Sequence, residues 1–347
     1  MMQNKIPRIL ITTPDYPPQK GGLATFSCNL EQALLRIFDL SKDAVRPWQV
    51  LVWNKWWHMP RPQQQQFDYV FHIQAWSQMR ALQVGGAKQI AFFHGSELTF
   101  HSPNFFWNQL KRLLKKFFFK KIASNTYNIF ISQFTQDFIT RQGFQADFAR
   151  DVIFHNAIQC QGHELAKLDW PQENESFKFI CVARDVPHKN LAGVLSFCQY
   201  WCEISGRQVT LYMTKNMLST SPGVEVVSIA GISNEKRDKL YQECHFNLLL
   251  SLDHSRQGFF EGFGLSCLEA ASFGTPSIVS SSGGLPENVH DGINGFVLPE
   301  LSISQVEKVF KRLDANNYTE LRGRTFSHTS ENHSVDIWAD FLKALLK

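Results

Sequence analysis

The sequence predicts an α/β protein made of two doubly wound domains, each built on a parallel sheet. The chain has 347 residues, more than a single hydrophobic core usually organises. Short apolar runs alternate with segments of helical length, as in parallel sheets whose strands are joined by helical crossovers. This alternation occurs in two series, which a polar stretch at residues 159–176 separates.

Each series contains six apolar runs that read as strands. In the first half we expect strands at residues 8–13, 49–53, 69–73, 89–93, 127–131 and 152–155. In the second half we expect them at residues 177–182, 209–213, 226–229, 246–250, 276–280 and 295–298. We therefore predict an amino-terminal domain at residues 1–163, a linker at 164–176, a carboxyl-terminal domain at 177–332 and a final helical segment at 333–347.

Composition excludes several classes of protein. With 44% hydrophobic and 19% charged residues the chain is an ordinary globular protein, and a net charge of +4 does not indicate a nucleic-acid partner. Seven cysteines without a Cys-x-x-Cys pair favour a reducing compartment. No signal-peptide core and no membrane-spanning run is present in the sequence. We expect a cytoplasmic location, with peripheral contact at the inner face of the cytoplasmic membrane left open.

Two features of the first half fall where strands end. Gly21 and Gly22 follow the first strand and open a helix, so the backbone can approach a ligand there and helix N–H groups can face an anion. His94 follows the strand at 89–93 and precedes Gly95. Carboxyl ends of strands form the binding crevice in doubly wound folds, which favours a functional role. A plain turn and a structural histidine remain the alternatives.

The second half begins with a strand followed by two cations. Arg184 and Lys189 frame a short turn around Pro187, and Asn190 stands where it can cap the following helix. Guanidinium and ammonium groups both neutralise phosphate oxygens, so the pair suits a diphosphate. Two solvated surface cations are the alternative interpretation.

The run Gly262-Phe263-Gly264-Leu265 resembles the start of a dinucleotide-binding fingerprint. The third glycine is missing, and the preceding strand ends near Leu250, too early for the tight turn of that motif. We reject nicotinamide binding and expect a loop that enters a helix at 265–273, with N–H groups available to phosphate or sugar oxygens. Gly283 and Gly284 follow a later strand in the same way. Spacings typical of metal ligands are missing from the sequence, so we expect a metal-independent site without a cofactor.

Residues Asn108–Ile122 form a basic amphipathic segment. Leucine, phenylalanine and isoleucine recur at helical spacing, while lysine and arginine gather on the other side. Two interpretations fit this pattern. The apolar face packs in the core while the basic face is solvated, or the segment binds an anionic membrane surface. Nucleic acid fits less well, because no recognisable reading module accompanies the charges.

Taken together, these motifs resemble the retaining glycosyltransferases of family 4, which have the GT-B architecture of two Rossmann-like domains. The most specific element is Glu261-Gly-Phe-Gly-Leu-Ser-Cys-Leu-Glu269, which matches the Glu-x7-Glu motif of that family. The resemblance extends over nearly the whole chain and includes the Gly21-Gly22 loop, His94, the Arg184 and Lys189 pair and the turn from Gly283 to Glu287. Ala157 and His188 depart from residues common in relatives, and neither belongs to the catalytic set.

The resemblance implies a role for each residue. Glu269 would bind the ribose of a nucleoside-diphosphate sugar and Glu261 the hydroxyls of its sugar. Arg184 and Lys189 would stabilise the departing diphosphate, and His94 would lie near the anomeric carbon. Backbone at Gly21, Gly22, Phe263, Gly264 and Leu265 would line the donor. In GT-B proteins the first domain binds the acceptor and the last helix returns to that domain.

The resemblance further implies transfer of a hexose-type sugar, with retention of configuration, to a glycan or lipid-linked acceptor in the synthesis of a polysaccharide or lipopolysaccharide. Two alternatives stay open. A GT-B sugar-nucleotide epimerase shares this architecture, although the Glu-x7-Glu motif argues against it. A non-catalytic, membrane-associated relative would use the basic segment alone, and the intact Arg184, Lys189, Glu261 and Glu269 argue against such a loss of function.

Overall fold

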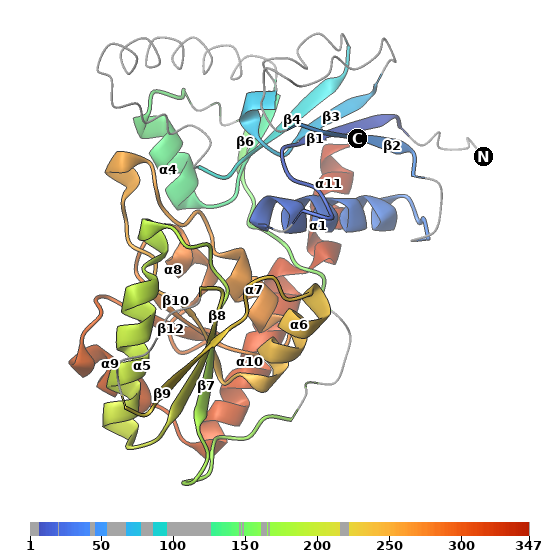
Figure 1. Ribbon diagram of the computed structural model, residues 1–347. Helices are drawn as coiled ribbons and strands as arrows, with labels where there is room; N and C mark the ends of the chain where they lie inside the picture. Colours follow the sequence, from blue (N-terminus) through green and yellow to red (C-terminus); the bar gives the residue numbers. More distant parts are fainter. Residues whose placement is uncertain are drawn as a thin grey trace. The chain divides into compact units, whose positions relative to one another are not determined.

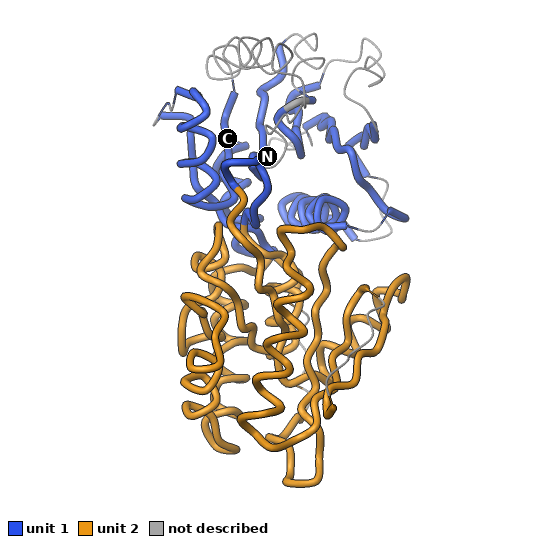
Figure 2. Tube along the Cα trace, turned by 60° about the vertical axis from the view of Figure 1, so that its left-hand side comes forward, with its two compact units in different colours: residues 1–157, 255–262, 335–347 blue, residues 158–254, 263–334 orange. Residues whose placement is uncertain are grey.

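The chain folds into two α/β units, coloured separately in Figure 2. The structure is a computed structural model that describes residues 7–19, 21–41, 46–53, 67–77, 86–95, 126–145, 147, 149–160, 165, 167–215 and 222–346. Unit 1 contains residues 1–157, 255–262 and 335–347, and unit 2 contains residues 158–254 and 263–334. The short insertion 255–262 departs from the expected boundaries, which assigned it to the second domain.

Unit 1 is built on a six-stranded parallel sheet with the order β2-β1-β3-β4-β5-β6. Its strands are β1 (Ile9–Thr13), β2 (Trp48–Val52), β3 (Tyr69–His72), β4 (Lys88–Phe93), β5 (Thr126–Phe130) and β6 (Asp151–Ile153). β1 is buried at every position, and β4 is buried from its second residue on, as expected for parallel strands covered on both faces. The strand order reverses between β1 and β3, which makes this the switch point of the sheet.

In the described part of unit 1 the helices are α1 (Gly22–Ile37), α4 (Gln133–Arg141) and α11 (Val335–Leu345), with a 3-10 turn, η2, at Ala75–Ser77. α1 and α11 lie side by side against the sheet (Figure 1). Phe26 of α1 meets the rings of Phe92 and Trp338, each at 4.9 Å between centroids. Trp338 Nε1 also donates to the carbonyl of His155 at 2.8 Å. Return of the last helix to the first unit was expected, and these contacts confirm it.

Unit 2 has a second six-stranded parallel sheet, with the order β12-β11-β10-β7-β8-β9. Its strands are β7 (Phe177–Cys181), β8 (Val209–Met213), β9 (Val224–Ser228), β10 (Phe246–Leu249), β11 (Ser277–Ser280) and β12 (Gly295–Leu298). Counted from β7 this is the strand order of the Rossmann fold. Its switch point lies between β7 and β10, which pair directly.

The sheet of unit 2 carries helices on both faces. The helices are α5 (Leu191–Ser205), α6 (Asn234–Glu243), α7 (Leu265–Ala271), α8 (Leu285–Asn288), α9 (Ile303–Phe310) and α10 (Ala315–His333), with 3-10 turns η4 (Pro187–Lys189) in this unit and η5 (Ser255–Gln257) in unit 1. α5 packs beside α9, while α6 packs beside α7 on the other side of the sheet (Figure 1). Trp201 of α5 is fully buried among aromatic rings of the larger core cluster.

The sequence-based expectations for the fold are largely confirmed. All twelve strands occur within two residues of their expected limits. The helix expected at 265–273 begins at Leu265, and Asn190 caps α5 as expected, since its Oδ1 accepts from Gly193 N at 3.2 Å. The basic segment Asn108–Ile122 lies outside the described residues. None of the helices in the described part of the chain is long and apolar enough to span a membrane.

Candidate functional site

The carboxyl edge of the unit 2 sheet brings several predicted site residues together at the switch point. The turn after β7 holds Arg184 and Lys189, and the chain after β10 runs alongside it. Asn190 Nδ2 donates to the carbonyl of Leu250 at 3.1 Å, and Leu252 N donates to the carbonyl of His188 at 2.7 Å. Because these bonds join the two strand ends, the turn has a fixed position where Rossmann folds bind nucleotides.

The two cations of this turn differ in exposure. Arg184 is exposed and forms no ion pair with any residue that the structure describes, whereas Lys189 is half-buried. Asp185, between them, pairs with Lys215 at 3.0 Å, so the nearby acid is engaged away from Arg184. Lys189 also faces Cys181 and favours its thiolate, although burial dominates and raises the pKa of that thiol to about 12. The turn therefore presents positive charge that an anionic ligand can use.

Glu269 lies in α7 and is buried, with 7% of its surface exposed. Its Oε2 accepts from the Tyr241 hydroxyl at 3.2 Å, and its Oε1 lies 3.4 Å from Arg237 Nη1. Burial raises the pKa of Tyr241 well above its usual value, and the adjacent Glu269 raises it further. Tyr241 thus remains a neutral hydroxyl donor. Arg237 supplies the charge that makes a buried carboxylate tolerable.

The loop Phe263–Leu265 enters α7 through Gly264, which has φ +86°. A Cβ at this position would lie 2.7 Å from Leu285 Cδ2, so both backbone conformation and packing favour glycine. Asn288 Nδ2 donates to the carbonyls of Phe263 and Gly264, at 2.9 Å each. The same loop therefore has a defined backbone path, with its carbonyls turned toward Asn288.

In unit 1, the loop before α1 is tied to the buried acid Glu31. Tyr16 donates to Glu31 Oε2 at 2.5 Å, while Trp48 Nε1 and Arg46 Nη1 donate to Oε1 at 2.7 and 2.8 Å. Burial raises the pKa of Tyr16 to about 12, with a further contribution from its hydrogen bond to Glu31. Gly21 and Gly22 follow this anchored segment and are exposed, so their backbone is accessible to a ligand.

His94 follows β4, as expected, and its ring packs edge-on against Phe26 at 4.6 Å between centroids. The residue retains some exposure, but its Nε2 atom is buried. Burial lowers the pKa of His94 to about 4, and a hydrogen bond with the backbone of Ile73 offsets this only in part. At neutral pH the ring is therefore uncharged.

Glu261 lies in the insertion 255–262, which is anchored on unit 1 at two points. Phe260 enters an aromatic cluster, with its ring 4.5 Å from Phe138 and 5.1 Å from Phe134 between centroids. The Ser132 hydroxyl donates to the carbonyl of Gly262 at 2.7 Å. Glu261, which is half-buried, stands between these two anchors.

Two glycines allow the insertion to approach the end of β4. A Cβ at Gly262 would lie 2.7 Å from the carbonyl oxygen of His94, and a Cβ at Gly95 would lie 2.3 Å from Phe260. Glu261 is therefore a neighbour of His94 along the same edge of unit 1. The structure groups His94, Glu261, Gly21 and Gly22 in unit 1, and Arg184, Lys189, Phe263, Gly264, Leu265 and Glu269 in unit 2.

Sequence reasoning missed the residues that hold the predicted site residues in place. Tyr241 and Arg237 are spaced by four residues on α6, so they share a face, and Tyr241 is fully buried in an otherwise polar helix. This four-residue spacing was the one feature of the sequence that could have indicated a paired role for Arg237 and Tyr241. Glu31 is the single acid of α1 and lies on its apolar, buried face. An acid in such a position also indicates that buried partners bind its carboxylate. The partners themselves come from other elements and are not visible in sequence.

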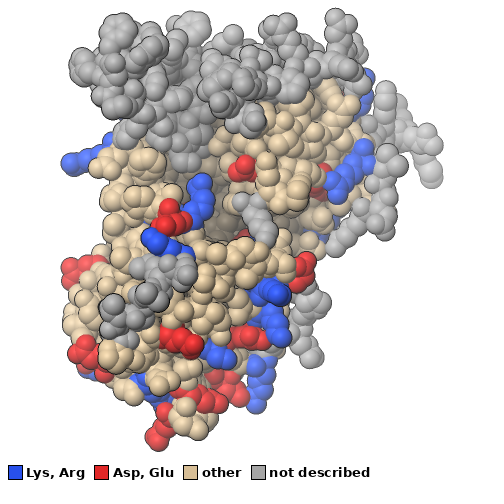
Figure 3. All heavy atoms as spheres, viewed as in Figure 1, with Lys and Arg blue, Asp and Glu red and all other residues tan. Residues whose placement is uncertain are grey.

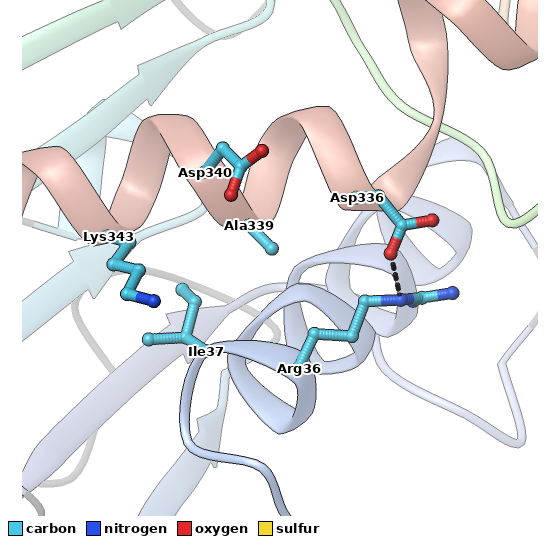
Figure 4. Close-up of a pocket in the computed structure, with 6 residues that line it drawn as sticks. All are labelled: Arg36, Ile37, Asp336, Ala339, Asp340 and Lys343. Atoms are coloured by element: carbon cyan, nitrogen blue, oxygen red, sulfur yellow. Dashed lines mark ion pairs between the residues drawn. The ribbon is translucent and has the colours of Figure 1, made fainter.

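A shallow hollow elsewhere in unit 1 does not match the predicted site. It lies between α1 and α11 and is lined by Arg36, Ile37, Asp336, Ala339, Asp340 and Lys343 (Figure 4). Arg36 Nε and Asp336 Oδ1 form an ion pair at 2.5 Å across it. Because both side chains are partly exposed, this pair contributes little to stability, about 0–1 kcal/mol. On the visible face of unit 2, acidic and basic side chains are interspersed (Figure 3).

No group of three or more histidine, cysteine or acidic side chains in the described ranges is placed to hold a metal ion. This observation covers only part of the chain, so the expectation of a metal-independent site stays a prediction.

Comparison with protein families identifies the larger part of unit 2. Residues 165–325 match the model of the family described as glycosyl transferases group 1. This part of the chain, just under half of its length, is therefore similar to the group 1 glycosyl transferases. The chain is 22% identical over 246 residues to the amylovoran biosynthesis glycosyltransferase AmsK of Erwinia amylovora. That alignment covers 68% of this chain and 58% of AmsK, so the chain spans just over half of that relative.

Solved structures with a similar fold show the architecture to which the chain belongs. Anabaena Alr3699/HepE in complex with UDP and glucose matches with a TM-score of 0.67 and 14% identity, over 98% of this chain and 99% of that one. Sucrose-phosphate synthase from Thermosynechococcus elongatus matches with a TM-score of 0.69 and 13% identity, over 98% of both chains. At these identities the likeness shows the fold alone, and that fold is GT-B. The expected fold class is thereby confirmed.

Proposed function

We propose that the protein is a retaining, metal-independent glycosyltransferase that uses a nucleoside-diphosphate sugar. The observation that carries this proposal is the similarity to the group 1 glycosyl transferases, with Arg184 and Lys189 at the switch point of the Rossmann sheet. The fold likeness to HepE, whose structure contains UDP and glucose, favours a uridine nucleotide as the first donor to test.

The contacts of unit 2 support assigning different residues to the ribose, the diphosphate and the sugar of the donor. Tyr241 and Arg237 fix the orientation of the Glu269 carboxylate, and we assign this group to the ribose hydroxyls. Arg184 and Lys189 are assigned to the diphosphate. The backbone of Phe263, Gly264 and Leu265 is assigned to the phosphate and sugar side of the donor.

We assign the sugar end of the reaction to unit 1 residues. Glu261 would bind sugar hydroxyls, and the neutral His94 would act as a hydrogen-bonding group near the anomeric carbon rather than as a cation. The exposed backbone of Gly21 and Gly22 would line the phosphates and the sugar. A neutral His94 fits its burial, because a charged ring there would be strongly disfavoured.

The chemistry follows from the leaving group. A nucleoside diphosphate departs as an anion, so stabilising its charge replaces protonation by a general acid. The C–O bond between anomeric carbon and phosphate breaks, the acceptor oxygen forms the new bond on the same face, and the acceptor proton passes to the departing phosphate oxygen. Arg184 and Lys189 would stabilise the charge of that phosphate, while the remaining groups orient the reactants. Glu261 and Glu269 hold one donor rather than act as an acid/base pair.

We further propose a hexose-type sugar and a glycan or lipid-linked acceptor in the synthesis of a cell-surface polysaccharide. The resemblance to AmsK, an amylovoran biosynthesis glycosyltransferase, supports this setting. We propose a cytoplasmic site of action with peripheral membrane contact through residues 108–122.

Calorimetry with UDP-, GDP- and ADP-sugars in excess EDTA tests the proposal. We expect saturable binding of one donor class, weakened by Arg184→Ala and unchanged by Arg324→Ala, which alters an exposed arginine in α10. Absence of binding to every donor with EDTA, followed by binding when Mg²⁺ is added, would overturn metal independence. Absence of binding under both conditions would overturn the proposed function.

A further inference from the structure

A connected set of polar side chains lies behind the Phe263–Gly264 loop and has no role in the mechanism above. It consists of Asn288 at the end of α8, His290 and Asn294 in the following turn, and His328 in α10. Asn288 and Asn294 are almost fully buried, at 1% and 3% exposure. Buried amides need partners, because a hydrogen bond left unmade in the interior destabilises the fold.

The orientation of the two amides follows from their neighbours. Asn288 Nδ2 must donate, because both of its contacts are backbone carbonyls, those of Phe263 and Gly264. Asn294 Oδ1 accepts from His290 N at 2.6 Å, and a backbone N–H can only donate. The Asn294 amino group therefore points the other way, where it donates to the carbonyl of Asn288 at 2.8 Å.

His328 and His290 continue the chain of hydrogen bonds that begins with the two amides. Asn294 Nδ2 lies 3.4 Å from His328 Nδ1, so that ring nitrogen must accept. A neutral His328 then carries its proton on Nε2, which donates to His290 Nδ1 at 3.1 Å. Protonation of either ring at Nδ1 would set two donors against each other.

Three titratable groups, in addition to His290, lie near His328 or next to His290. His333 lies 5.8 Å from His328 between ring centroids, and Glu331 favours the charged form of His328. Asp291, next to His290, is paired with Arg312 at 2.8 Å. Burial and the adjacent His290 lower the pKa of His328 despite Glu331.

We propose that Asn288 is a positioning residue for the donor-binding loop, held in place by the chain Asn294, His328 and His290. This inference rests on the proposed function. Gly264 has φ +86°, and glycine adopts positive and negative φ about equally well, so its own backbone preference does not fix the path of the loop. The surroundings have to supply that constraint. One amide that binds two successive carbonyls supplies such a constraint. The loop is then preorganised before the donor arrives.

The first test replaces Asn288 with leucine, which has the same branched arrangement of side-chain heavy atoms and no hydrogen-bonding groups. We expect UDP-glucose to bind about tenfold more weakly to Asn288→Leu, with UMP binding nearly unchanged, because UMP lacks the sugar and the second phosphate. Val309→Ala is the matched control, since it loosens the same unit from α9 and away from the loop. Equal UDP-glucose affinity in Asn288→Leu and wild type, or an equal loss in Val309→Ala, would overturn the inference.

The second test uses His328→Asn, whose Oδ1 can replace the accepting Nδ1 without a titrating group. We expect wild-type affinity for UDP-glucose to fall from pH 7 to 5, and the fall to be smaller in His328→Asn. Equal pH profiles would contradict a role for the histidine pair.

Hydrogen exchange of the unliganded protein separates this inference from the proposed function. The amides of Leu265 and Ser266 should exchange faster in Asn288→Leu than in wild type or Val309→Ala. If wild type binds no nucleotide, the proposed function fails, and this exchange rate alone decides whether Asn288 holds the loop. Unchanged exchange would overturn the inference independently of any ligand.

Discussion

At the residue scale, the candidate site depends on charges whose surroundings set their behaviour. Arg184 is exposed while Asp185 pairs with Lys215, so the guanidinium remains available. Glu269 is buried against Tyr241 and Arg237. Unit 2 therefore supplies two differently prepared groups: an accessible cation in the turn after β7 and an oriented carboxylate in α7.

Replacement of the cations should separate binding from chemistry. If Arg184 and Lys189 stabilise the departing diphosphate, Arg184→Ala and Lys189→Ala should each lower kcat by about 10²–10³, with smaller changes in KM. The fall in kcat should be smaller for a donor whose leaving group is more acidic, because that group needs less stabilisation. Steady-state kinetics with Arg207→Ala and Arg324→Ala as controls checks this. A loss confined to KM would indicate uniform binding instead.

Tyr241→Phe removes one hydroxyl and little else. We expect the free energy of unfolding to fall by about 1–3 kcal/mol, because Glu269 loses a hydrogen bond in a buried position, and donor affinity to fall several-fold. Chemical denaturation and calorimetry measure the two effects. Tyr212→Phe is the control, since the Tyr212 hydroxyl has no hydrogen bond among the described residues. Equal behaviour of both variants would remove Tyr241 from the site.

At the element scale, the insertion 255–262 separates the two acids of the Glu-x7-Glu motif. The sequence suggests a single site segment, but the structure assigns Glu261 to unit 1 and Glu269 to unit 2. Phe260 in its aromatic cluster and Gly262 beside Ser132 hold the first acid. The second acid belongs to α7, so the two acids are positioned by separate sets of contacts.

Phe260→Ala should loosen the insertion selectively. Truncation of a buried phenylalanine costs about 3–5 kcal/mol, so we expect a lower free energy of unfolding, faster hydrogen exchange across residues 255–262 and a reduced kcat. Phe259→Ala is a close control, because Phe259 is 47% exposed and exposed positions usually change stability by less than about 0.5 kcal/mol. If the two substitutions have the same effect on exchange, the insertion is not anchored through Phe260.

At the scale of the whole molecule, three buried histidines make stability depend on pH in both units. Burial lowers the pKa of His72 and His94 in unit 1, and of His245 in unit 2, to about 4 each. The unfolded chain has a histidine pKa near 6.5. The folded state therefore binds fewer protons than the unfolded state between these values, and its stability decreases as the pH falls.

We expect the free energy of unfolding to be steady above about pH 7, and to decline from about pH 6.5 toward pH 4. Denaturant unfolding across this range measures the slope. His72→Gln should reduce the slope for unit 1, because its amide can retain a bond with Gln89, which His72 contacts at 2.6 Å. A slope unchanged by this substitution would mean that His72 is not a source of the dependence.

The sequence by itself determined the twelve strands, the paired α/β units and the strand-end positions of several candidate residues, among them His94 and Arg184. Strand periodicity and glycines at strand ends are local signals, and parallel strands must place their carboxyl ends at one edge. Asn190 illustrates the same point, since its capping role depends only on the three residues after it.

Only the tertiary structure decided which partners prepare these residues. Glu269 meets Tyr241, 28 positions away, and Ser132 meets Gly262, 130 positions away. Asn288 binds the Phe263–Gly264 loop from another helix, and Phe260 enters a cluster of the first unit. Such contacts depend on how crossover helices and loops pack against a sheet. No local pattern encodes them, because burial and hydrogen bonding between distant segments are fixed only when the whole unit folds.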